Sequence, residues 1–233
     1  AMHLLGLGES NIGYIKLDQS GRTCAKSLNK EIQSAIKSGR PILGVVAIVG
    51  TTELGTIYPV DSISSVLQEF RNNEGYDIWF HVDGAYGGFM GSLVNDPGTK
   101  EESVISDALE SSLKAIALSD SITLDPHKLG YVPYSSGAFI CQDQKNYFMR
   151  SFTGPYIVSE EKNIGNFTLE GSRSAAGAVA TYASIKSFDS SGGYKKLLKR
   201  TIQAKKDFES KIRKLNFNVY IPQGLDTNIL CFA

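Results

Sequence analysis

Along this chain, short apolar or alternating segments follow segments in which apolar residues recur at helical spacing. Residues 42–49 form a nearly unbroken apolar run, and residues 77–83 and 121–124 are shorter apolar or alternating segments. These three segments predict strands, the first of them buried on both faces. Apolar residues recur at helical spacing in 27–38, 62–72 and 101–118, which predicts a helix before each strand. This order predicts an α/β fold with a layered, mostly parallel sheet.

The second half of the chain continues with mixed elements. Residues 135–141 predict a further buried strand, and the alanine-rich segment 175–186 predicts a helix. Gly192 and Gly193 separate it from a basic helix over 194–215, whose charges we expect to lie on a solvated face. Residues 217–221 and 228–232 predict two short strands.

Composition and charge argue against several classes of function. The 233 residues are 42% hydrophobic and 21% charged, with 24 basic and 24 acidic side chains, which is typical of a soluble globular protein. The balanced charge gives no sign of a nucleic-acid or membrane partner, and no apolar run reaches the length of a membrane span. The three cysteines are far apart, which argues against a disulfide framework or a zinc site and suits a reducing cytoplasm.

A single lysine follows the strand at 121–124. The strand ends at Asp125 and Pro126, because proline lacks a backbone donor, and His127 and Lys128 come next. The neighbouring residues are apolar or aromatic, and no acidic residue follows until Asp143. Such surroundings disfavour the charged form of a lysine and suit an amine that forms a Schiff base. The alternative is an ordinary solvated lysine.

A carboxylate ends the apolar strand at 77–83. Asp83 stands at its carboxyl end, where ligands bind in α/β sheets. Gly84 and Ala85 leave room for a flat group to approach the backbone.

The two motifs together carry a family resemblance. His-Val-Asp-Gly-Ala-Tyr-Gly-Gly at 81–88 and Asp-Pro-His-Lys-Leu-Gly-Tyr-Val-Pro-Tyr at 125–134 resemble the signature of the pyridoxal-phosphate-dependent group II amino-acid decarboxylases, in the branch with tyrosine and glutamate decarboxylases. The resemblance implies a fold-type I large domain over residues 1–190 and the start of a small C-terminal domain over 191–233. It also implies that the family's N-terminal part and most of its C-terminal domain lie outside this chain.

The resemblance assigns roles residue by residue. Lys128 would carry pyridoxal phosphate, Asp83 would pair with the pyridine nitrogen, and Ala85 would pack on one face of the ring. Thr52, rather than Thr51, would lie near the ring or the lysine. The cofactor-binding set would be completed by Asp125 and His127; the alternative for His127 is a hydrogen bond to the strand backbone.

Residues 148–166 have the composition of a long exposed loop, and such loops often act as lids. The resemblance implies that Tyr156 reaches the active site from this loop; alternatively, it packs the loop down. Arg173, in a Gly-Ser-Arg turn, suits an anion or an ion pair across a subunit interface.

The resemblance implies decarboxylation of an L-amino acid, either aromatic, such as tyrosine, or glutamate, by a cytoplasmic homodimer. The family's ring-stacking histidine has no counterpart in this sequence. An inactive fragment that keeps the fold as a binding or dimerising module is therefore the alternative. A carbon–carbon lyase of the same fold is disfavoured by Pro126, Pro133 and Tyr134.

Overall fold

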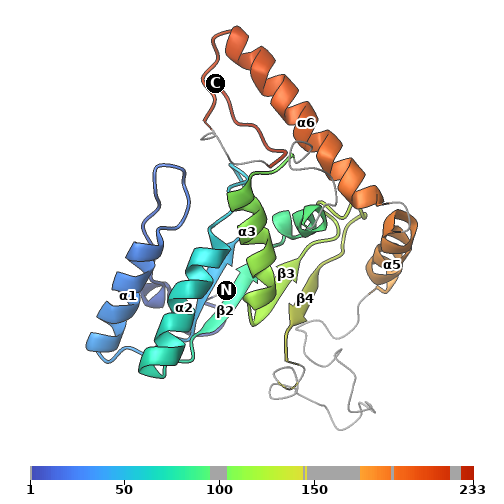
Figure 1. Ribbon diagram of the computed structural model, residues 1–233. Helices are drawn as coiled ribbons and strands as arrows, with labels where there is room; N and C mark the ends of the chain where they lie inside the picture. Colours follow the sequence, from blue (N-terminus) through green and yellow to red (C-terminus); the bar gives the residue numbers. More distant parts are fainter. Residues whose placement is uncertain (1, 95–103, 144, 146–173, 190–191, 221–226) are drawn as a thin grey trace.

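The computed structural model of the chain describes residues 2–94, 104–143, 145, 174–189, 192–220 and 227–233 (Figure 1). Its centre is a sheet of four strands: β1 (Gly44–Ile48), β2 (Trp79–Asp83), β3 (Ser121–Leu124) and β4 (Ala138–Cys141). They lie in the order β1-β2-β3-β4. The first three are parallel and β4 is antiparallel to β3, so the predicted mostly parallel sheet is confirmed.

Three helices cover one face of this sheet. They are α1 (Ala25–Lys37), α2 (Val60–Glu74) and α3 (Asp107–Ala115), which lie side by side in Figure 1. The core lies between them and the sheet, where Phe80 and Val82 of β2 pack with apolar side chains of the helices. Removal of these side chains from water is the main force that holds the layers together.

The rest of the described chain adds short 3-10 helices and two further α-helices. The 3-10 helices are η1 (Glu9–Asn11), η2 (Gly87–Leu93) and η4 (Ile116–Leu118). α5 (Ala176–Asp189) and α6 (Gly193–Lys214) contact each other, and α6 also packs on η2 directly after β2. No helix in the described part of the chain is long and apolar enough to cross a membrane.

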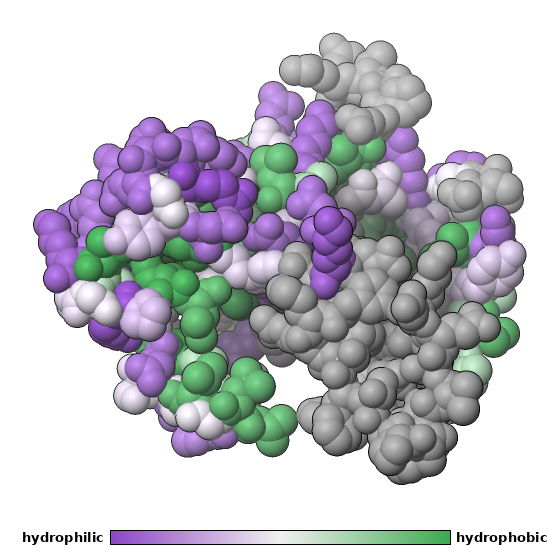
Figure 2. Space-filling model, turned by 90° about the horizontal axis from the view of Figure 1, so that it is seen from below, coloured by the Kyte–Doolittle hydropathy of each residue, from purple (hydrophilic) through white to green (hydrophobic). Residues whose placement is uncertain are grey.

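The expectation that 42–49 and 135–141 are buried strands is wrong. Val46 in β1 is 60% exposed and Phe139 in β4 is 53% exposed. The reason is that, within the described residues, helices cover only the face to which Ala47, Phe80 and Val82 point. Hydrophobic side chains therefore reach the surface, and Figure 2 shows such side chains gathered beside a hydrophilic region.

The helix expected over 101–118 is shorter in the structure. α3 begins at Asp107, because Ser106 caps it by accepting a hydrogen bond from the Leu109 amide at 3.3 Å. It ends at Ala115, where the chain tightens into η4.

The segments expected as two short strands near the end of the chain contact each other only briefly among the described residues. Asn218 and Ala233 exchange backbone hydrogen bonds, and the Tyr220 amide donates to the Cys231 carbonyl. These bonds surround a single antiparallel bridge between Val219 and Phe232. The domain boundary expected at residues 190 and 191 lies outside the described residues and stays a prediction.

Candidate functional site

A cavity of about 520 Å³ lies at the carboxyl ends of β1 and β2. Its lining includes Asp83, Ala85 and Lys128 together with the turn that follows β1, residues 50–54. Two motifs separated by some forty residues thus meet in one place, because β2 and β3 are parallel neighbours and their carboxyl ends share one edge. The volume is in the range of small-molecule sites.

Asp83 is held at its strand end by the chain that follows it. The Ala85 amide donates to Asp83 Oδ1 at 3.1 Å. The Ala85 carbonyl in turn accepts a hydrogen bond from the Asp125 amide at 3.2 Å. The two motifs are therefore joined directly through their backbones.

The turn after β1 touches the segment after Asp83. Gly50 has a φ of 93°, a conformation that favours glycine, and an added Cβ would lie 2.9 Å from the Gly87 amide nitrogen. A Cβ on Gly87 would lie 2.6 Å from the Val49 carbonyl oxygen. Both positions need glycine so that the threonine turn can reach the cavity.

The two threonines of this turn differ in their contacts. Thr51 Oγ1 accepts a hydrogen bond from the Thr56 amide at 2.9 Å, so it stabilises the turn itself. Thr52 also lines the cavity and has no hydrogen-bond partner among the described residues. The Thr52 hydroxyl is the one open to a ligand, in keeping with the preference for Thr52 over Thr51.

The lysine is less isolated than its sequence neighbours suggested. Lys128 Nζ lies 2.8 Å from Asp125 Oδ2, and the lysine side chain is 36% exposed. The expectation of purely apolar surroundings is therefore wrong. The partner precedes Lys128 by three residues, and the turn brings it back onto the amine.

His127 contacts both the backbone of the segment before β4 and the acidic partner of the lysine. Its Nδ1 is hydrogen-bonded to the Ser136 carbonyl, and its ring lies 4.2 Å from that of Tyr134, between centroids. Its Nε2 lies 3.6 Å from Asp125 Oδ2. The alternative for His127 was a hydrogen bond to the strand backbone; the bond in the structure goes instead to Ser136, two residues before β4, and the ring also stands beside the Asp125–Lys128 pair.

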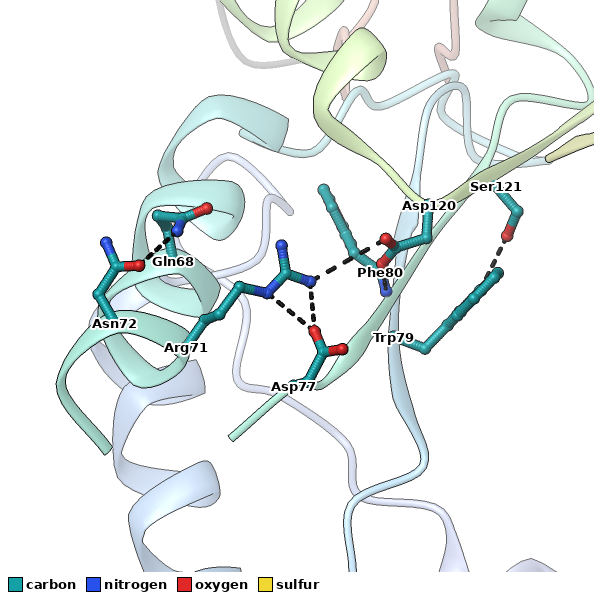
Figure 3. Close-up of polar contacts among 8 residues, drawn as sticks. All are labelled: Gln68, Arg71, Asn72, Asp77, Trp79, Phe80, Asp120 and Ser121. Carbon is teal, nitrogen blue, oxygen red and sulfur yellow. Dashed lines mark hydrogen bonds and ion pairs between the residues drawn. The ribbon is translucent and has the colours of Figure 1, made fainter. Parts of the chain in front are cut away.

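A polar network continues from Asp83 along the same face of β2. His81 Nδ1 lies 2.8 Å from Ser121 Oγ, and His81 Nε2 lies 3.1 Å from Thr123 Oγ1. The indole nitrogen of Trp79 donates to the same Ser121 oxygen at 3.0 Å (Figure 3). Burial lowers the pKa of His81 from 6.5, and the opposing effect of Asp83 is smaller.

Tyr86 is a site residue to which no role was assigned from the sequence. It lines the cavity, and its hydroxyl donates to Asn228 Oδ1 at 2.8 Å. Burial raises the pKa of Tyr86 above 10.0 and the nearby Tyr131 adds to this, so Tyr86 is a neutral donor at physiological pH. Its place in the motif at 81–88 was the available signal.

The C-terminal segment lies against the threonine turn. The Cys231 thiol donates to the Glu53 carbonyl at 3.0 Å, and a Cβ on Gly55 would lie 2.7 Å from Thr227 Oγ1. The buried hydroxyls of Thr56 and Thr227 have no hydrogen-bond partner among the described residues.

Two expected site residues cannot be placed. Tyr156 and Arg173 lie outside the described residues. Within the described ranges, no cluster of three or more histidine, cysteine or acidic side chains is arranged to hold a metal ion.

Residues 4–233 match the family described as "Pyridoxal-dependent decarboxylase conserved domain". An L-tyrosine decarboxylase of Enterococcus faecium is 32% identical, over 94% of this chain and 39% of that protein. A probable L-tyrosine/L-aspartate decarboxylase of Methanothermobacter thermautotrophicus is 30% identical, over 100% of this chain and 56% of that protein. The chain thus spans between two fifths and three fifths of the length of these relatives.

Solved structures show the same fold. The crystal structure of mouse CSAD in apo form has a TM-score of 0.78 and 22% identity, over 99% of this chain and 45% of that one. Catharanthus roseus tryptophan decarboxylase, solved with L-tryptophan, has a TM-score of 0.75 and 21% identity, over 99% and 44%. The expected fold-type I architecture is confirmed.

Proposed function

The chain belongs to the pyridoxal-dependent decarboxylase family, and from this premise we propose that the protein containing it removes the α-carboxylate of an L-amino acid, releasing carbon dioxide and an amine. One observation carries the proposal most directly. The amine of Lys128 and the carboxylate of Asp83 line a single cavity at the carboxyl ends of the strands. A covalent anchor and a charge for the ring nitrogen are two of the groups that pyridoxal phosphate needs from a protein.

The side chains of the cavity fit this cofactor. The lysine amine suits its aldehyde, the carboxylate suits a protonated pyridine nitrogen, and Ala85 is small enough for a flat ring to approach. The cofactor supplies an electron sink for the bond that breaks, and the protein binds and orients it.

Each candidate site residue can be given a role in the proposed reaction. Lys128 would hold the cofactor and release it to the substrate amine. When no cofactor is attached, the Lys128 ammonium forms an ion pair with Asp125. Asp83 would keep the pyridine nitrogen protonated, because an opposite charge nearby favours the charged form. Thr52 and His127 would contact the cofactor, and Tyr156 would return a proton to the substrate α-carbon.

The substrate we propose is an aromatic L-amino acid, with L-tyrosine first and L-glutamate as the alternative. Support comes from the relatives, several of which are L-tyrosine decarboxylases at 28–32% identity. Other relatives act on aspartate or 2,4-diaminobutyrate, so the substrate side chain must be tested directly. A homodimeric assembly and a cytoplasmic location stay predictions.

The test is to trap the cofactor on the protein. With pyridoxal phosphate and borohydride, the wild type should give one covalent adduct at Lys128, and Lys128→Ala should lose both the adduct and the visible absorbance of the bound cofactor. Lys114→Ala is a matched control, because Lys114 pairs with Glu110 on α3, away from the cavity lining. An adduct mapped to another lysine in the wild type would contradict the assignment.

A further inference from the structure

His81 is a titratable group next to the site, and the proposed function does not use it. It lies two residues before Asp83 on β2, so both side chains stand on the same face of the sheet. In the register it is opposite Ser121, and Asp83 is opposite Thr123. The hydroxyls that His81 contacts therefore belong to the strand that leads to Lys128.

Hydroxyl groups of β3 contact both nitrogens of the His81 ring. The Trp79 indole can only donate, so Ser121 Oγ accepts from it at 3.0 Å. The Ser121 hydroxyl is then free to donate to His81 Nδ1, 2.8 Å away. His81 Nε2 lies 3.1 Å from Thr123 Oγ1 and can donate to it. With its proton on Nε2, a neutral imidazole satisfies all these donors and acceptors.

The surroundings of the ring also favour its neutral form. Burial lowers the pKa of His81 below 6.5, and this outweighs the opposing effects of Asp83 and of a hydrogen bond to the Ser121 backbone. The Phe139 ring of β4 stacks on it with centroids 5.9 Å apart. Besides Trp79 and His81 itself, the side chains on this face of the sheet are Asp83 from β2, Ser121 and Thr123 from β3, Phe139 and Cys141 from β4, and Val46 and Ile48 from β1.

We propose that His81 is a positioning residue that acts through Asp83. Its neutral imidazole, held between Ser121 and Thr123, keeps positive charge away from the carboxylate, so that Asp83 is left to the cationic pyridine nitrogen of the cofactor. This inference rests on the proposed function, because it needs a cationic group at Asp83. Protonation of His81 would place a second cation beside the same carboxylate and weaken the binding of the first.

The coupling between protonation of His81 and cofactor binding can be measured in two ways. Pyridoxal phosphate should bind less tightly in acid, as His81 becomes charged, and bound cofactor should lower the pKa of His81 by the same factor, since linkage is reciprocal. For two like charges near a shared carboxylate at a partly buried site, we expect a change in affinity of about three- to tenfold.

The experiment measures the dissociation constant of pyridoxal phosphate for the full-length protein between about pH 5 and pH 8, the range in which histidine titrates. Wild type and His81→Gln are compared, because the amide keeps hydrogen-bonding groups but takes no charge. The ratio of the two constants cancels the titration of the cofactor itself. It should change about three- to tenfold across this range in favour of His81→Gln at low pH.

A matched control is His3→Gln, because His3 is an exposed histidine paired with Glu9, away from the cavity lining. It should follow the wild-type profile. A second readout uses the wild type alone: imidazole nitrogen chemical shifts should show a lower His81 pKa with cofactor bound.

The outcomes separate the two proposals. A wild type that binds no pyridoxal phosphate overturns the proposed function and this inference with it. Normal binding with a ratio that is constant in pH overturns only the role of His81. If His81→Gln fails to fold, the chemical shifts decide, and a His81 pKa that is the same with and without cofactor overturns the inference.

Discussion

Asp83 is held by one backbone donor, the Ala85 amide, which bonds to Oδ1. Asp83→Asn keeps the shape and removes the charge, so it separates electrostatics from packing. We expect a loss of about 2–4 kcal/mol in transition-state stabilisation, the usual effect of removing one aimed electrostatic group. The measurement is kcat/KM for amine formation by the full-length protein. Asp77→Asn is the control, because Asp77 is exposed and pairs with Arg71 (Figure 3); equal rates for wild type and Asp83→Asn would refute the role.

Four of the residues singled out from the sequence lie around one cavity. Asp83 ends a predicted strand, Ala85 and Lys128 follow predicted strands, and Thr52 lies in the turn after one; Asp125 and His127 are not part of the lining. The contact between Asp125 and Lys128 was missed, because only the acidic residues after the lysine were considered. The bond between Tyr86 and Asn228 joins positions 142 residues apart, which no local pattern encodes.

At the scale of elements, the threonine turn and η2 meet through two glycines. Gly87→Ala would place a methyl group 2.6 Å from the Val49 carbonyl oxygen, where only backbone movement can relieve the contact. We expect the free energy of unfolding to fall by about 1–3 kcal/mol, as for other overpacked sites. Denaturant unfolding measures it. Gly91→Ala is the control in the same 3-10 helix, because an added Cβ there meets nothing within 4 Å; equal stability of the two variants would contradict the close approach.

Element types were predictable, but the covering of the sheet was not. Helical spacing and apolar runs located α1, α2 and three parallel strands. An apolar run, however, records only that a strand suits burial, and the exposed Val46 and Phe139 show that the described helices cover one face. α3 begins later than expected for a local reason, because the Ser106 side chain caps its first turn.

At the scale of the whole molecule, one buried hydroxyl joins three segments. Ser112 on α3 is fully buried; its Oγ donates to Asp61 Oδ1 on α2 at 3.1 Å and accepts from Arg22 Nη2 at 3.3 Å. Arg22 Nε also donates to the Ile57 carbonyl at 2.9 Å. These hydrogen bonds hold the segment around Arg22 against α3, and the same segment contributes Leu17 and Gly21 to the cavity lining.

Ser112→Ala should lower the free energy of unfolding by about 1–3 kcal/mol, because it removes the two hydrogen bonds that this fully buried hydroxyl makes with the partly buried Asp61 and Arg22. Thermal and denaturant unfolding give the value. Ser111→Ala changes the neighbouring exposed serine on the same helix and should have little effect. A Ser112→Ala variant as stable as the wild type would show that the network does not hold the segments together.

The contacts of the C-terminal segment with the threonine turn and with Tyr86 have a consequence for biosynthesis. The ribosome makes the β1 turn and Tyr86 long before it makes Asn228 and Cys231, which contact them. A nascent chain can form the parallel strands as they emerge, yet the contacts that hold the threonine turn and Tyr86 form only when the last of these residues leaves the exit tunnel. These two parts of the cavity lining should therefore become fixed late, and a stalled ribosome that exposes the chain only to α6 should present the strands with the turn and Tyr86 not yet held.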